Sequence, residues 1–78
     1  MAQFTKRAER DLSNLPESLQ GKARALIARL ETEPALGKKL LGPLAGKRSI
    51  WLGRSHRIIY TLDPIVILTI VPRRDAYR

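Results

Sequence analysis

The chain has 78 residues, enough for one domain with a single small core, and its lack of cysteine excludes a disulfide framework and a thiolate metal site. Fifteen Lys and Arg against seven Asp and Glu give a net charge of +8, which favours a polyanionic partner: nucleic acid, an anionic membrane or an acidic protein. No apolar run approaches the roughly 20 residues that cross a bilayer, and the basic N-terminus lacks a signal-peptide core, so we expect a cytoplasmic protein.

The N-terminal segment predicts a very short strand followed by a helix. Residues Met1 to Phe4 form the strand, and Thr5 is a suitable N-cap for a helix over about residues 6–14. One apolar stripe runs along this helix, made by Phe4, Ala8, Leu12 and Leu15. The basic residues of the helix point away from that stripe, so we expect them to be solvated.

A second helix is predicted between two prolines. Pro16 suits the first turn of a helix, and Pro34 stops the run after Glu33 because proline lacks the N–H donor and disfavours the helical conformation just before it. The apolar positions that repeat with helical period are Leu19, Ala23, Leu26, Ile27 and Leu30. The two amphipathic segments together predict a helical hairpin.

The remainder of the chain predicts a loop and then three strands. The leucine- and glycine-rich segment 35–46 has the composition of a loop. Strands rich in β-branched and aromatic residues are predicted at Lys47–Leu52, His56–Leu62 and Ile65–Val71. The short breaks between them indicate antiparallel hairpins, and the whole pattern predicts an α+β fold with one domain over residues 1–78.

Alternation along the strands divides the side chains between two faces of the sheet. One face carries Ile50, Leu52, Ile58 and Tyr60, and we expect the helices to cover it, with Tyr60 in the core. The open face then carries Ser49, Trp51 and Arg57. An arginine beside a tryptophan on an uncovered sheet is a possible platform for phosphates and bases.

Four segments, taken in order, resemble the RelE/ParE superfamily of bacterial type II toxins. They are the opening Phe4-Thr5-Lys6-Arg7-Ala8-Glu9-Arg10-Asp11-Leu12, the loop ending in Leu44-Ala45-Gly46, the strand Arg57-Ile58-Ile59-Tyr60, and the ending Arg73-Arg74-Asp75-Ala76-Tyr77. The resemblance covers nearly the whole chain. It implies an N-terminal helical hairpin packed on one face of a small antiparallel sheet, and an acidic antitoxin that wraps and neutralises the toxin.

Two activities are implied by this resemblance. RelE-like members cut mRNA in the ribosomal A site, whereas ParE-like members poison DNA gyrase. The functional residues of the nuclease branch fall on Arg57, Arg73 and Tyr77. Where some nucleases of the family carry two lysines on the first strand after the loop, this chain has Ser49 and Trp51. The match at the three positions favours a ribosome-dependent mRNA endonuclease.

Cleavage of RNA without a metal or other cofactor needs a base, an acid and cations that hold the developing charge. We expect Arg57 and Arg73 to clamp the scissile phosphate, with Tyr77 or His56 moving protons or stacking on a base. Lys47, Arg48 or His56 is a possible substitute for the missing lysines. The residues expected to contact RNA are Lys47, Arg48, Trp51, Arg54 and Arg74. The alternatives are a ParE-like gyrase inhibitor and a non-catalytic basic RNA-binding module held by an antitoxin.

Overall fold

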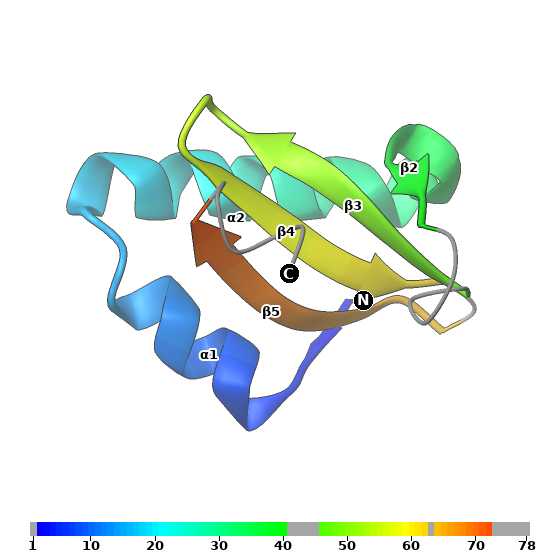
Figure 1. Cartoon of the computed structure of the whole chain (residues 1–78), viewed down its shortest axis with the longest axis horizontal. Coiled ribbons are helices and arrows are strands. Elements are labelled where there is room, and N and C mark those ends of the chain that lie inside the picture. The colour runs from blue at the N-terminus through cyan, green and yellow to red at the C-terminus, as the bar shows by residue number, and fades with distance from the viewer. Residues whose placement is uncertain (1, 41–45, 63, 73–78) are drawn as a thin grey trace.

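The computed structural model describes residues 2–40, 46–62 and 64–72. Its elements are β1 (Gln3–Phe4), α1 (Lys6–Ser13), α2 (Glu17–Thr32), the 3-10 turn η1 (Pro34–Leu36), β2 (Lys38–Lys39), β3 (Lys47–Leu52), β4 (His56–Thr61) and β5 (Val66–Pro72). Figure 1 shows α2 running behind β3 and β4, with α1 beside β5. The predicted helical hairpin and the three main strands are therefore confirmed: β3 has the predicted bounds, and the boundaries of the two helices and of β4 and β5 differ by at most one residue.

The sheet has five strands in the order β1-β5-β4-β3-β2. The two predicted hairpins, β3–β4 and β4–β5, are antiparallel, and so is the pair β2–β3, but β1 runs parallel to β5. The expectation of a purely antiparallel sheet is thus wrong at one edge. The two-residue β1 leads directly into α1, and its direction follows from the packing of that helix along β5.

Side chains at the start of α1 take the place of a neighbouring strand along the outer edge of β5. The Thr5 hydroxyl accepts a hydrogen bond from the Ala8 N–H (3.0 Å), as the predicted N-cap, and donates one to the Leu68 carbonyl (2.7 Å). In the second turn of α1, the Asp11 carboxylate accepts hydrogen bonds from the Ile70 N–H (3.1 Å) and the Thr69 hydroxyl (2.5 Å). An edge that would otherwise expose unpaired backbone groups is covered in this way.

A bulge in β5 adjusts which side chains reach the core. The register with β4 shifts between Ile59 and Tyr60, whose partners are Thr69 and Ile67, so that Leu68 is skipped. Ile67 and Ile70 are both buried in the same core cluster although they are three residues apart. Strict alternation would have placed them on opposite faces.

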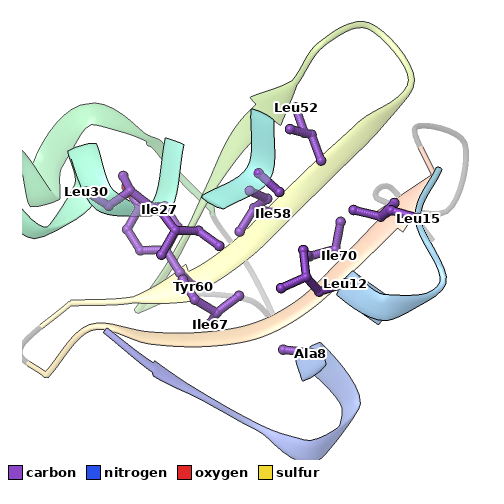
Figure 2. Packing of buried hydrophobic residues seen from close by; sticks show 11 residues of the cluster. Ala8, Leu12, Leu15, Ile27, Leu30, Leu52, Ile58, Tyr60, Ile67 and Ile70 are labelled. Carbon is purple, nitrogen blue, oxygen red and sulfur yellow. The ribbon is translucent and has the colours of Figure 1, made fainter. Parts of the chain in front are cut away.

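The core lies between the helices and the inner face of the sheet, as predicted. Its largest fully buried side chains are Tyr60, Leu30, Leu52, Ile58 and Ile67. Figure 2 shows Leu30 and Ile27 of α2 against Tyr60, and Leu12 of α1 near Ile70. Of the helices in the described ranges, none is both long enough and apolar enough to cross a membrane.

The segment predicted as a loop, 35–46, contains β2 and most of η1, and side chains of β3 and β4 hold this part of the chain through three hydrogen bonds. The Tyr60 hydroxyl donates to the Pro34 carbonyl (2.9 Å) and accepts from the Gly37 N–H (2.8 Å). Arg48 Nη1 donates to the Gly37 carbonyl (2.8 Å). Both backbone groups of Gly37 are therefore satisfied by side chains of β3 and β4. These contacts place β2 at the edge of the sheet.

We expect Gly37→Ala to destabilise the fold. A Cβ atom at this position would lie 2.7 Å from Tyr60 Cε1 and 2.8 Å from the Ser49 carbonyl oxygen, so the chain must shift away from the sheet. Overpacking of this kind costs about 1–3 kcal/mol. The matched control is Gly21→Ala within α2, where nothing lies within 4 Å of the added Cβ and helix propensity favours alanine by about 1 kcal/mol. Urea unfolding should move the two midpoints in opposite directions.

We expect Asp11→Ala to lower the free energy of unfolding by about 1–3 kcal/mol, because it leaves the Ile70 N–H and the Thr69 hydroxyl without their acceptor. Glu9→Ala, an exposed change in the first turn of the same helix, should lose only the helix-dipole contribution of about 0.3–1 kcal/mol. Equal losses for the two variants in thermal or urea unfolding would show that Asp11 does not stabilise the edge of β5.

Candidate functional site

Arg57 lies on β4, the middle strand of the sheet, and its side chain contacts two residues of β3. It pairs with Trp51 across the β3–β4 ladder, and its Cζ atom lies 4.1 Å from the centroid of the indole ring. Its Nη1 donates a hydrogen bond of 2.9 Å to Ser49 Oγ. The prediction that these three residues share the face opposite the core is confirmed. We call this surface, with Lys47 at its other end on β3, the arginine face.

The arginine face is less open than the sequence predicts. Ser49 is 3% exposed and Arg57 is 7% exposed, while Trp51 is 39% exposed. The expectation of an uncovered Ser49 and Arg57 was therefore wrong. Contacts with the serine hydroxyl and the indole ring occupy part of the guanidinium surface. A buried cation needs such contacts, since an arginine removed from water is costly without hydrogen-bond acceptors.

Within the part of the chain that the structure describes, the carboxylate side chains lie in the helical layer. The five Asp and Glu residues in the described ranges all belong to α1, to α2 or to the residue that caps α2: Glu9, Asp11, Glu17, Glu31 and Glu33. Within the described ranges, strands β2 to β5 carry lysine and arginine but no carboxylate side chain. Positive potential therefore accumulates on the arginine face, where it attracts anions.

The other predicted RNA contacts from β3 and its turn are spread over different surfaces. Lys47 is on the arginine face, opposite Thr61 of β4. Arg48 is on the helical side, where it bonds to the Gly37 carbonyl. Arg54 is exposed in the turn after Gly53, which has the positive φ of 62° that favours glycine. Arg57 and Arg48 consequently do not act on one surface.

His56 is next to Arg57 in sequence but is on the opposite face of β4. Successive residues of a strand alternate between faces, and His56 shares the parity of the buried Ile58. Its Nδ1 forms a hydrogen bond of 2.7 Å with Ser55 Oγ at the turn. The structure therefore does not bring the imidazole to the guanidinium of Arg57.

The predicted roles of Arg73, Arg74 and Tyr77 concern residues outside the described ranges. The described part of β5 ends at Pro72, one residue beyond Val71, which is the partner of Arg57 across the β4–β5 ladder. The chain thus enters the segment 73–78 from the strand next to Arg57. Arg73 follows closely in sequence after the strand that pairs with Arg57, and the roles of Arg73, Arg74 and Tyr77 stay predictions.

Sequence reasoning missed the part that Ser49 plays at this site. The residue stood out only as the replacement of an expected lysine, whereas in the structure its hydroxyl holds the Arg57 side chain. The signal was available, because the two residues share a face and lie on adjacent predicted strands.

The ranges that the structure describes contain no group of three or more His, Asp or Glu side chains able to hold a metal ion.

Comparison with known proteins gives a family for the whole chain. A model described as the ParE toxin of type II toxin–antitoxin systems, parDE, matches residues 2–77. A search of curated protein sequences finds no significant match. Among solved structures, the RelBE2 toxin–antitoxin complex of Mycobacterium tuberculosis contains a chain 33% identical to this one, with a TM-score of 0.82 and coverage of 94% of this chain and 96% of that chain.

Two further structures share the fold at lower identity. The YoeB–YefM complex of Staphylococcus aureus has a TM-score of 0.79 at 23% identity, covering 91% of this chain and 93% of that chain. The YoeB/ParE toxin of Agrobacterium tumefaciens has a TM-score of 0.82 at 18% identity, covering 92% and 96%. Given the match over residues 2–77 and the shared architecture of helical hairpin and five-stranded sheet, the chain belongs to the ParE toxin family of type II toxin–antitoxin systems, within the RelE/ParE superfamily.

Proposed function

We propose that this toxin inhibits translation by cutting mRNA on the ribosome, and that Arg57 is the centre of its phosphate site. The observation that carries the proposal is the guanidinium of Arg57, held by Ser49 and Trp51 on a sheet surface without described carboxylates. A cation held in place before the substrate arrives stabilises transition-state charge without having to reorganise. The 33% identity to a chain of a RelBE complex supports the nuclease branch of the superfamily.

The proposed reaction is transesterification within the RNA. The 2′-oxygen attacks the adjacent phosphorus and gives its proton to a base, the bond from phosphorus to the 5′-oxygen breaks, and that oxygen takes a proton from an acid. The products are a 2′,3′-cyclic phosphate and a 5′-hydroxyl end. Negative charge grows on the non-bridging oxygens, and the planar fork of Arg57 suits these oxygens because it stays charged and offers several N–H donors.

The remaining roles follow from position in the fold and in the chain. Arg73 is the proposed second cation of the clamp and Tyr77 the proposed proton-transfer or stacking group. Trp51 has one face against Arg57 and is partly exposed, so it is the proposed stacking surface for a base. Arg48 and His56 face the helical side or its end, so we assign neither to the phosphate clamp. Lys47, Arg54 and Arg74 are proposed contacts to the RNA backbone.

The proposed partners follow from charge and family. A toxin of this family acts beside an antitoxin, and the net charge of +8 favours an acidic antitoxin that covers the basic surface. We propose the cytoplasm as the compartment, where ribosomes and mRNA are found. The alternative function, inhibition of DNA gyrase, is favoured by one observation, which is that the matching family model is that of ParE.

We expect Arg57→Ala to slow mRNA cleavage by about 100-fold or more, because it removes a positioned donor to the transition state. Arg57→Lys should recover only a small part of the rate, since an ammonium cannot bond to phosphate in the same bidentate way. The matched control is Arg29→Ala on α2, where the exposed arginine pairs with Glu33 at 3.3 Å and should matter little. The measurement is a cell-free translation reaction in which mRNA 5′ ends are mapped with and without ribosomes.

A gyrase supercoiling assay on the same proteins separates the two activities. Intact mRNA together with blocked supercoiling by the wild-type chain would replace the nuclease with a gyrase inhibitor. Inactivity in both assays would leave a non-catalytic RNA-binding module, and full cleavage by Arg57→Ala would remove Arg57 from the site.

We expect Trp51→Ala to reduce cleavage by about 10-fold and Trp51→Phe to reduce it by less than threefold. Phenylalanine keeps an aromatic face for Arg57 and for a base, and a cation–π contact of a buried arginine is worth about 2 kcal/mol. Single-turnover cleavage rates test this, with urea unfolding to separate a loss of stability. Equal rates for the two variants would mean that the ring does not hold the arginine in its working position.

A further inference from the structure

Strand β2 adds a cation to the arginine face that the sequence analysis did not identify. Its first residue, Lys38, pairs with Ser49 of β3, and its second, Lys39, pairs with Arg48. Directly opposed residues in an antiparallel ladder share a face. Lys38 therefore lies on the arginine face, together with Ser49, while Lys39 lies on the helical side with Arg48.

The register places Ser49 between two cations. On one side, Ser49 Oγ accepts the hydrogen bond from Arg57 Nη1 at 2.9 Å. On the other side, Lys38 lies directly opposite Ser49 on the neighbouring strand, and the backbones of neighbouring strands are about 4.8 Å apart. Lys38 is exposed and carries its ammonium on a flexible four-carbon stem, so it can reach a ligand bound at the guanidinium.

The described strands around this pair carry lysine and arginine. All described carboxylates belong to the helical layer, as set out above, and none lies on β2 to β5. Lysines at a sheet edge also discourage pairing with other strands. That purpose is served equally by Lys38 and Lys39, whereas only Lys38 is on the same face as Arg57. A comparison of variants at Lys38 and at Lys39 therefore tests whether the position on the arginine face matters.

We propose that Lys38 and Arg57 together bind one phosphodiester group of single-stranded RNA, with Ser49 between them. Arg57 supplies the fixed planar donor and Lys38 a mobile point charge that closes on the same phosphate from the edge of the sheet. The identity of the ligand as RNA rests on the proposed function. The pairing of the two cations rests on the register and on the hydrogen bond to Ser49.

The binding test uses the full-length protein and a short single-stranded RNA in which every ribose is 2′-O-methylated, so that it lacks the attacking hydroxyl. Fluorescence anisotropy at several salt concentrations should show that Lys38→Ala weakens binding about 10-fold and lowers the slope of log K against log salt by about 0.7, the contribution of one phosphate contact on a single strand. Lys39→Ala should change affinity less than twofold, and Lys38→Arg should stay close to the wild type.

A double-mutant cycle tests whether the two cations share a ligand. Loss of Arg57 should remove most of the effect of Lys38→Ala, because two groups that bind one phosphate are not additive. In the ribosome assay, Lys38→Ala should slow cleavage about 10-fold and Lys39→Ala less than twofold. Thermal unfolding of each variant confirms that the exposed substitutions leave the fold intact.

The outcomes separate this inference from the proposed function. Identical binding and cleavage by Lys38→Ala and Lys39→Ala would overturn the paired site, even where Arg57→Ala abolishes cleavage and so upholds the nuclease. Binding of the methylated RNA that depends on both Lys38 and Arg57, without cleavage by the wild-type chain, would uphold the paired site and overturn the nuclease. Additive effects in the cycle would mean that the two residues bind separate phosphates, which also overturns the proposal.

Discussion

The hydrogen-bonded register of β4 is the constraint on which the rest of the structure depends. This strand pairs with β3 on one side and β5 on the other, so its side chains are fixed in two directions at once. Tyr60 points inward and holds η1 and β2 through its hydroxyl. Arg57 points outward and is held by Ser49. A slip of one residue would exchange these two faces, and would remove both Tyr60 from the core and Arg57 from the proposed phosphate site.

Because the domain is small, hydrogen bonds from side chains, rather than apolar packing, fix the edges of its sheet. A chain of 78 residues buries only roughly 60% of its unfolded surface, and its apolar cluster lies on one side of the sheet. The edges are instead secured by Asp11 along β5 and by Arg48 and Tyr60 at Gly37. Each of these bonds involves a backbone group that a larger protein would satisfy with another strand.

Much of this fold was accessible from sequence because the signals were long and periodic. The helices, the three long strands and the division of β4 into inner and outer residues follow from spacing alone, and Thr5 and Pro34 mark helix ends by known chemistry. The very short first strand was predicted, but its direction was not, and β2 was missed because alternation has no meaning over two positions. For this reason the parallel β1 and the position of Lys38 emerged only from the register. The burial of Arg57 was missed because it depends on contacts across strands.

The core and the arginine face lie on opposite sides of the sheet, so residues of the arginine face can change independently of the core. Ser49, Trp51 and Lys38 share a face with Arg57 and do not belong to the core cluster, so we expect substitutions among them to alter the proposed phosphate site with little effect on packing against the helices. A lysine supplied from β2 occupies the same face as one placed on β3, since the register of an antiparallel ladder makes the two positions neighbours. With Ser49 and Trp51 on β3, this surface still has a cation on the adjacent strand, which is Lys38. In the proposed site the cation comes from the adjacent strand β2, at the edge of the sheet, where Lys38 is exposed and its side chain is flexible.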